Sequence, residues 1–330
     1  MNKKDFRIVF MGTPEFAVAS LEKLQQDGYS IGAVVTAPDK PAGRGKKMQA
    51  SAIKQFAEAN GLKVLQPEKL KSADFLDELT ALQADLFVVV AFRMLPEVVW
   101  NMPPKGTINL HASLLPQYRG AAPINRAVMN GETGTGLSTF FLTHEIDTGN
   151  VIAQVKLPIG FSDNAGDMHD RMMLAGADLL SETVERIINN NYRAIPQSEE
   201  KGAENDLKKA PKIFKEDCLI NWHQSGLIIY NQIRGLSPYP AAFTEIHSPK
   251  IETYQLKIFS STFEPFDTDK DSVLNSMPPG SVLIEGRKNM RIAAQDGWIS
   301  VKEVQQSGRK RMSVGDYLRG LTNCSDLKAS

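Results

Sequence analysis

Short apolar runs alternate with helix-like segments over residues 1–190. Apolar residues recur three or four positions apart in segments 14–28 and 51–61, and each segment ends at a glycine, as amphipathic helices often do. The strand-like runs of this region cover residues 6–12, 29–37, 62–66, 86–92, 106–112, 136–143 and 151–159. Strands that alternate with helices in this way predict βαβ units around a mostly parallel sheet.

The pattern changes in the second half of the chain. A long helix is predicted for 163–189, and the segment 191–207 then loses its periodicity and fills with polar residues, which is typical of a linker. A short helical stretch follows at 227–233. The strand-like runs after it lie at 241–247, 255–263, 281–286, 289–295 and 297–305. Short runs at this spacing predict a small antiparallel barrel of the OB type.

Two domains are therefore expected, and the length of 330 residues agrees with this because one domain usually holds ~100 to 200 residues. We expect an α/β domain over 1–190, a linker over 191–207 and an OB-like β-barrel over 208–330.

The composition is that of a folded protein, with 42% hydrophobic and 23% charged residues. The two cysteines, Cys218 and Cys324, are too few for a disulfide framework or a structural zinc site, and no metal is expected. The N-terminus is interpreted as a first strand rather than a signal peptide, and no apolar stretch reaches the ~18 residues of a membrane span. We therefore expect a cytoplasmic protein with no membrane partner.

The net charge of zero hides an asymmetry. Residues 1–207 hold 21 basic and 25 acidic side chains, whereas residues 208–330 hold 17 and 13. The second part is slightly basic, which weakly favours a polyanionic partner, although a solvated face explains it as well.

A basic segment at 37–51 is longer than a βα connection of ~2 to 6 residues requires. Its cationic residues are Lys40, Arg44, Lys46 and Lys47, interspersed with two glycines and two prolines. Such an arm suits phosphate groups, since cations release counterions and glycines let the backbone follow a groove. An ordinary solvated loop is the alternative.

A glycine after the first strand is typical of dinucleotide-binding domains, but the rest of their glycine motif is absent here. The Rossmann fingerprint has three glycines in G-x-G-x-x-G spacing, and only Gly12 is present here. Hydride chemistry is thus only a minor alternative.

Asn109, His111 and Asp147 are the candidate catalytic residues. Strand alternation places Asn109 and His111 on one face at the end of a strand, and open α/β sheets bind ligands at the carboxyl ends of their strands. Asp147 leaves a later strand into a turn and could reach the same edge. An amide donor, an imidazole and a carboxylate together suit stabilisation of a charged intermediate and proton transfer. A structural histidine, a turn-forming Asp and a loop-capping Asn are the alternatives.

The sequence resembles the methionyl-tRNA formyltransferase family over nearly its whole length. The resemblance is carried by MGTPEFA at 11–17, APDKPAGRGKK at 37–47, INLHASLLPQYRGAAPINRA at 108–127, APKIFKEDCLINW at 210–222 and IRGLSPYPAAF at 233–243. The third string marks the wider group of enzymes that use 10-formyltetrahydrofolate, and the last two narrow the choice to those that act on tRNA.

The resemblance implies a Rossmann-like formyltransferase domain that binds 10-formyltetrahydrofolate as the formyl donor, and an OB-like domain that binds methionyl initiator tRNA. It places the family's catalytic trio on Asn109, His111 and Asp147. Folate contacts are implied at Ser113, Leu114, Leu115 and Pro116, and in the loop that contains Arg93; tRNA contacts are implied at Lys40, Arg44, Lys46 and Lys47. A monomer is expected.

The sequence departs from the family pattern at a few positions. Arg93 stands where relatives usually have glycine, Leu137 where threonine is common, and Gln117 where arginine is frequent. The methionine usual before the catalytic acid is absent. None of these departures involves the trio.

The function that this resemblance implies is transfer of a formyl group to the α-amino group of methionyl initiator tRNA. Three alternatives remain open: formyl transfer to a small amine such as an amino sugar, hydrolysis of the formyl folate, and RNA binding without catalysis.

Overall fold

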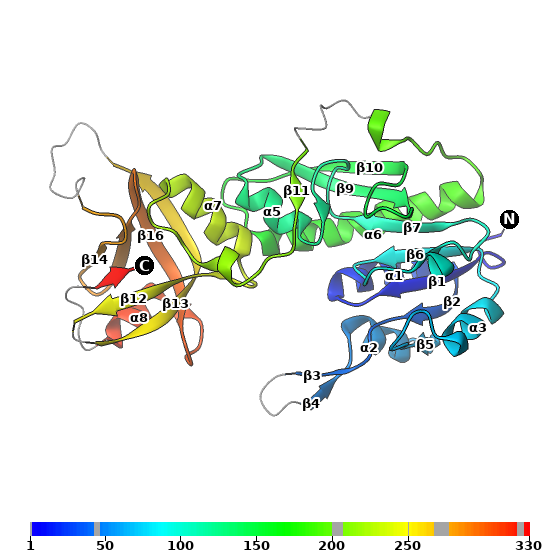
Figure 1. The fold of residues 1–330 in the computed structure, drawn as a ribbon, viewed down its shortest axis with the longest axis horizontal. Helices are drawn as coiled ribbons and strands as arrows, with labels where there is room; N and C mark the ends of the chain where they lie inside the picture. Colours follow the sequence, from blue (N-terminus) through cyan, green and yellow to red (C-terminus); the bar gives the residue numbers. More distant parts are fainter. Residues whose placement is uncertain (1, 43–46, 200–206, 250, 267–276, 322–326) are drawn as a thin grey trace. The chain divides into compact units, whose positions relative to one another are not determined.

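A computed structural model describes residues 2–42, 47–199, 207–249, 251–266, 277–321 and 327–330 (Figure 1). The chain divides into two compact units. The first comprises Met1–Gly120, Gly134–Pro158 and His169–Lys209, and the second Ala121–Thr133, Ile159–Met168 and Ala210–Ser330.

The first unit is built on a seven-stranded sheet in the order β10-β9-β7-β6-β1-β2-β5. The strands are β1 (Arg7–Gly12), β2 (Ser30–Val35), β5 (Val64–Leu65), β6 (Leu86–Val90), β7 (Thr107–His111), β9 (Gly134–Phe141) and β10 (Val151–Pro158). Strands β1, β2, β5, β6 and β7 run parallel to one another. Strand β9 is antiparallel to β7, and β10 is antiparallel to β9. The predicted mostly parallel, Rossmann-like sheet is confirmed.

Helices connect and cover these strands (Figure 1). They are α1 (Glu15–Gln26), α2 (Ala52–Ala59), α3 (Ala73–Ala81), α4 (Glu97–Trp100) and α6 (Ala165–Ile188). Val9, Met11 and Val89 of the sheet pack in one cluster with Phe75 and Leu79 of α3. All five side chains are at most 5% exposed, so burial of this apolar layer holds the sheet in place.

Gly12 ends β1 for a steric reason. A Cβ at this position would lie 2.6 Å from Cβ of Ala17 and 3.0 Å from the carbonyl oxygen of Val90. Only glycine lets α1 and β6 approach the end of β1 so closely. Gly12 therefore has a packing role at the end of β1.

The basic segment forms a short hairpin of β3 (Lys40–Ala42) and β4 (Lys47–Gln49) that projects from the first unit (Figure 1). Its base is anchored by Asp39, whose carboxylate accepts hydrogen bonds of 2.8 Å from Nζ of Lys54 and from Nε2 of Gln66. The pKa of Asp39 is lowered, chiefly by the hydrogen bond from Lys54 and next by the one from Gln66. The same bond to Asp39 raises the pKa of Lys54.

The second unit contains a curled antiparallel sheet in the order β14-β15-β16-β13-β12-β18, with β17 beside β16. Its strands are β12 (Ala242–Ser248), β13 (Ile251–Pro265), β14 (Val282–Glu285), β15 (Asn289–Ala293), β16 (Gly297–Gln306), β17 (Met312–Ser313) and β18 (Lys328–Ala329). A bridge between Ser281 and Lys328 brings the two ends of the sheet together. The predicted OB-like architecture is confirmed.

Helices fill and flank this curled sheet. They are α5 (Pro123–Met129), the 3₁₀ helix η3 (Glu216–Cys218), α7 (Gly226–Leu236) and α8 (Val314–Arg319); β11 (Lys209–Ala210) lies where the chain enters the unit. Ile233 of α7, Leu256 of β13 and Tyr317 of α8 are at most 1% exposed and share one apolar core. Within the described ranges, no helix combines the length and apolar character needed to cross a membrane.

Candidate active site

Asn109 and His111 lie on β7, which pairs in parallel with β6 and antiparallel with β9. Their neighbours Ile108 and Leu110 are buried on the opposite face, as the alternation predicted. Asn109 is half-buried, and its side-chain amide makes no hydrogen bond to another residue that the structure describes. Its two N–H donors therefore remain available to a ligand at the carboxyl end of the strand.

The orientation of the His111 ring is set by the backbone of a neighbouring loop. Nε2 of His111 lies 2.9 Å from the carbonyl oxygen of Tyr118. A carbonyl oxygen can only accept, so Nε2 carries a proton and Nδ1 is the nitrogen that can gain or lose one. The rings of Phe140 and His111 are nearly perpendicular, with centroids 6.5 Å apart, and His111 is only 7% exposed.

Asp147 reaches the same place from the loop between β9 and β10. Its Oδ2 accepts a hydrogen bond of 3.0 Å from the backbone N–H of Gly120 and lies 3.9 Å from Nδ1 of His111. The backbone of Asp147 has φ +55°, a left-handed conformation that costs most L-residues roughly 1 to 2 kcal/mol and that Asp tolerates better. The structure thus brings the carboxylate, the imidazole and the Asn109 strand together.

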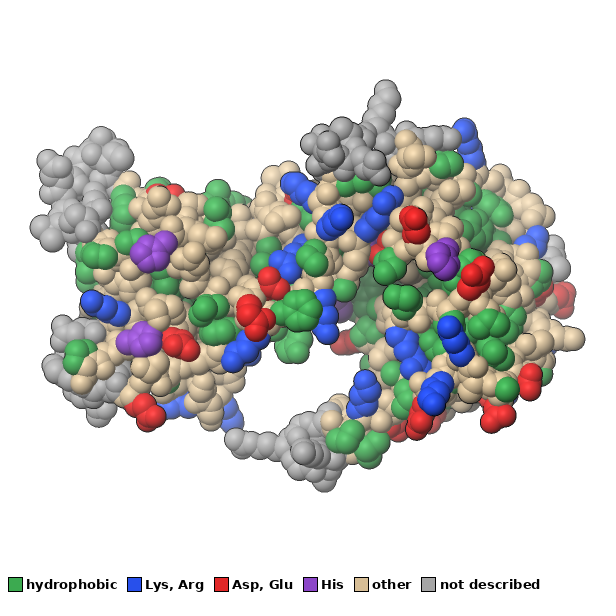
Figure 2. Space-filling model, in the orientation of Figure 1, with side chains coloured by type: hydrophobic (Ala, Val, Ile, Leu, Met, Phe, Trp, Pro, Cys, Tyr) green, Lys and Arg blue, Asp and Glu red, His purple; other side chains and the backbone are tan. Residues whose placement is uncertain are grey.

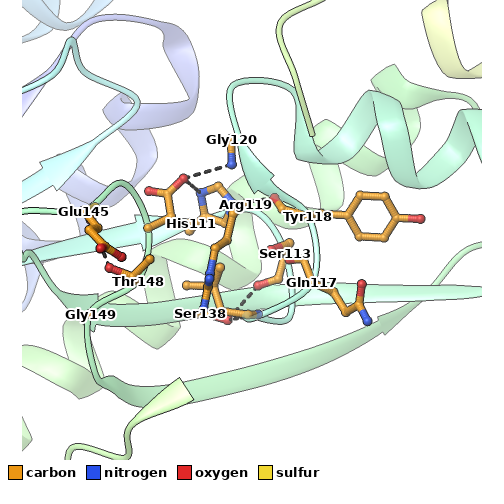
Figure 3. A network of polar contacts seen from close by, with 12 residues as sticks. His111, Ser113, Gln117, Tyr118, Arg119, Gly120, Ser138, Glu145, Thr148 and Gly149 are labelled. Atoms are coloured by element: carbon orange, nitrogen blue, oxygen red, sulfur yellow. Dashed lines mark hydrogen bonds and ion pairs between the residues drawn. The ribbon is translucent and has the colours of Figure 1, made fainter. Parts of the chain in front are cut away.

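Tyr118, Arg119 and Gly120 form a short segment, with β8 at Arg119–Gly120, that organises both side chains. The carbonyl of Tyr118 orients His111, and the N–H of Gly120 holds Asp147. In Figure 3, Arg119 and Gly120 lie beside the imidazole of His111. The site is therefore framed by main-chain groups, which are fixed by the fold rather than by side-chain rotamers.

The four residues of the HASLLP string implied in folate binding have different surroundings. The hydroxyl of Ser113 is buried and donates to the carbonyl of Gln117 at 2.6 Å. Leu115 is 2% exposed and packs with Phe140, and its N–H donates to Oγ of Ser138. Leu114 and Pro116 are half-buried. Ser113 and Leu115 thus shape the turn from within, while Leu114 and Pro116 keep some surface for a ligand.

Arg93 is exposed, and its guanidinium contacts another loop. NH1 donates to the carbonyl of Glu68 at 3.1 Å, and NH2 donates to the carbonyl of Pro67. The guanidinium also lies 5.7 Å from the centre of the Phe92 ring. Arg93 therefore ties the loop after β6 to the loop after β5.

Two of the four residues implied in tRNA contact lie on the strands of the projecting hairpin. Lys40 is exposed on β3, Lys47 lies on β4, and Arg44 and Lys46 fall outside the described residues. On the face seen in Figure 2, Lys and Arg side chains are interspersed with Asp and Glu side chains. The hairpin remains the candidate for phosphate contact that the sequence indicates in the first unit.

Two residues at this site had not been predicted from the sequence. Gln197, in the 3₁₀ helix η1 (Gln197–Glu199), is 5% exposed and donates to the carbonyls of Asp147 and Gly149, both at 2.8 Å. Its Oε1 accepts from Nε and NH2 of Arg119 at 2.9 and 2.6 Å. Arg119 lies in a quoted motif, whereas Gln197 lies in the polar segment interpreted as a linker, where nothing in the local pattern marks it.

The described parts of the chain contain no group of three or more His, Cys, Asp and Glu side chains that could hold a metal ion. The donors at the site are an amide, an imidazole and a carboxylate. This set suits an oxygen that gains negative charge and a proton that moves between nitrogens.

Comparison with known proteins assigns the family. Residues 6–184 match the formyl transferase family, and residues 212–322 match the formyl transferase C-terminal domain. The chain is 51% identical over 331 residues to methionyl-tRNA formyltransferase of Bacteroides fragilis, with 100% of both chains covered. It is 52% identical over 320 residues to the enzyme of that name from Bacteroides thetaiotaomicron, with 97% of both covered.

Solved structures share the fold at lower identity. An N-formyltransferase from Helicobacter canadensis, in complex with folinic acid and dTDP-3-aminofucose, is 22% identical with a TM-score of 0.64, covering 93% of this chain and 100% of its own. HypX from Aquifex aeolicus, in complex with tetrahydrofolic acid, is 16% identical with a TM-score of 0.64, covering 98% of this chain and 51% of its own. Because two formyl transferase domains and full-length relatives match, the chain belongs to the methionyl-tRNA formyltransferase family.

Proposed function

We propose that this protein transfers the formyl group of 10-formyltetrahydrofolate to the α-amino group of methionyl initiator tRNA, giving N-formylmethionyl-tRNA for translation initiation. The observation that carries the proposal is the approach of Asp147 to Nδ1 of His111 beside the unpartnered amide of Asn109. The full-length identity to methionyl-tRNA formyltransferases supports the choice of substrates.

The donor set fits formyl transfer to an amine. The amine attacks the formyl carbon, and negative charge develops on the formyl oxygen as the tetrahedral intermediate forms. Asn109 donates an N–H to that oxygen, and the protonated Nδ1 of His111 donates a second hydrogen bond. Asp147 stabilises the protonated imidazole and helps the proton of the attacking amine reach the leaving folate nitrogen.

We assign the formyl donor to the domain of residues 1–190 and tRNA to the OB-like domain of residues 208–330, with 191–207 as the linker between them. Leu114 and Pro116 contribute surface for the folate, while Ser113, Leu115 and Arg93 shape the loops around it. Lys40 and Lys47 contact tRNA phosphates from the hairpin, and Arg44 and Lys46, which lie outside the described residues, make further phosphate contacts. The protein acts as a monomer in the cytoplasm, where initiator tRNA is charged.

The test incubates purified protein with 10-formyltetrahydrofolate and methionyl initiator tRNA and measures N-formylmethionine on the tRNA. Methionyl elongator tRNA is the acceptor control, and a reaction without tRNA measures formate release. We expect formylation of the initiator tRNA only.

Formate release without formylated tRNA would indicate a hydrolase, and formylation of an amino sugar alone would indicate a small-amine transferase. Binding of tRNA with no turnover of the folate would indicate an RNA-binding protein.

A further inference from the structure

Gln197 occupies a buried position between two parts of the site that are distant in sequence. Both hydrogens of its Nε2 are used, one on the carbonyl of Asp147 and one on the carbonyl of Gly149. Its Oε1 accepts two N–H groups of Arg119. Because carbonyls only accept and a guanidinium only donates, the amide has one possible orientation.

We infer that Gln197 and Arg119 are positioning residues that hold Asp147 against His111. This inference rests on the proposed function, since it explains how one member of the trio is kept in place. Asp147 lies in a left-handed backbone conformation on an exposed loop, where Glu145 and Ile146 are solvent-accessible. Local bonds within the loop, such as Thr148 Oγ1 to the carbonyl of Glu145 at 3.2 Å, do not connect it to the sheet.

The connection to the rest of the site is made from two directions. Gly120 N–H holds the Asp147 side chain, and Gln197 holds the main chain of the same residue. Arg119 precedes Gly120, so one short segment provides both the direct bond and the anchor for Gln197. Losing the Gln197 donors should leave the carbonyls of Asp147 and Gly149 without this partner and let the carboxylate move away from the imidazole.

Gln197→Glu tests this inference with little change in shape. The carboxylate keeps Arg119 as a partner but removes both donors to the carbonyls. We expect kcat to fall on the order of 10²-fold, since a displacement of about 1 Å in a reacting group can cost that much, while the KM values for folate and tRNA remain unchanged. Hydrogen exchange of the 143–150 segment should become faster.

Gln232→Glu is the matched control. Nε2 of Gln232 also donates to two carbonyls two residues apart, those of Asp217 and Leu219, at 3.0 and 3.1 Å. It lies in the other unit. We expect this variant to leave exchange of the 143–150 segment and kcat at saturating tRNA as in the wild type.

A double-mutant cycle separates positioning from general stability. If Gln197 acts through Asp147, adding Gln197→Glu to Asp147→Asn should cost little further activity. Multiplicative losses, or an unchanged exchange rate of the 143–150 segment in Gln197→Glu, would overturn the inference. If Gln197→Glu fails to fold, Arg119→Lys serves instead, because it retains the charge but loses the two-nitrogen contact, and the same exchange and kcat changes are expected.

The exchange comparison needs no substrate. A wild-type protein that formylates no tRNA therefore contradicts the proposed function alone, and exchange in Gln197→Glu still decides whether Gln197 holds the Asp147 loop.

Discussion

Nδ1 of His111 lies 3.9 Å from Oδ2 of Asp147, whose hydrogen bond comes instead from the N–H of Gly120 at 3.0 Å. This separation is too long for a hydrogen bond, which ends near ~3.2 Å, yet it is within the range of direct charge attraction. Nδ1 therefore faces the carboxylate without being bound to it. The nitrogen remains free to exchange a proton with a substrate, and the carboxylate lies close enough to interact with the imidazole electrostatically.

The trio should be needed for turnover rather than for folding. We expect Asn109→Ala, His111→Ala and Asp147→Ala each to lower kcat by roughly 10²- to 10³-fold, as losing one donor to a developing oxyanion typically does. Steady-state formylation kinetics measure the effect, and thermal unfolding checks the fold.

His144→Ala is the control for this prediction. His144 lies in the same loop as Asp147, but its side chain is 88% exposed and its nearest acidic group is Glu97 at 3.8 Å. Wild-type kcat is expected. A loss equal to that of His111→Ala would point to His144 as the functional imidazole, and wild-type rates in all three trio variants would refute the assignment.

Gly149 should not tolerate a side chain. A Cβ at this position would lie 1.7 Å from the carbonyl oxygen of Phe141, a backbone atom that cannot rotate away. We expect Gly149→Ala to destabilise the protein by roughly 1 to 3 kcal/mol, as overpacking does, and to lower kcat by displacing the Asp147 loop. Gly134→Ala on β9 is the control, because its Cβ would come no closer than 3.8 Å to any neighbour. Equal melting temperatures for the two variants would contradict the steric argument.

The hairpin anchor should respond to acid in a defined direction. Hydrogen bonds from Lys54 and then Gln66 lower the pKa of Asp39, so its folded value lies below the unfolded value of about 3.9. Its contribution to stability is therefore present above about pH 4 and is lost as the pH falls through the lowered value. The difference in melting temperature between wild type and Asp39→Asn should be constant near neutral pH and should shrink below about pH 4.

The same substitution should affect tRNA use. We expect Asp39→Asn to raise the KM for tRNA without changing kcat, because the base of the hairpin loosens while the trio is untouched. Glu58→Gln is the matched control, since Glu58 is a more distant partner of Lys54 at 3.8 Å. A raised KM in both variants would mean that charge alone, not the Asp39 anchor, governs tRNA binding.

Arg44 should contact a phosphate. Arg44→Ala is expected to weaken initiator tRNA binding and to reduce the slope of log affinity against log salt by about 1, as loss of one phosphate contact does. Arg44→Lys should retain most of that slope because it keeps the charge. Titrations of charged initiator tRNA across a range of salt concentrations measure both. Identical slopes for wild type and Arg44→Ala would indicate a loop that is merely solvated.

The order of apolar and polar residues was sufficient to predict the parallel sheet, the long helix and the curled barrel. Helices and strands that bury one or both faces have characteristic spacings of apolar residues, so these elements can be predicted from the local sequence. For the same reason, the two-residue spacing of Asn109 and His111 was enough to predict that they share a face of β7.

The partners of these residues were decided only by the tertiary structure. Gln197 bonds Asp147 across 50 positions and Arg119 across 78, and no local period records contacts of that range. The tautomer of His111 likewise depends on where the Tyr118 carbonyl lies. The sequence by itself determined which chemical groups the protein carries and on which elements; their orientation was determined by packing, since hydrogen-bond geometry depends on distances that only the folded chain sets.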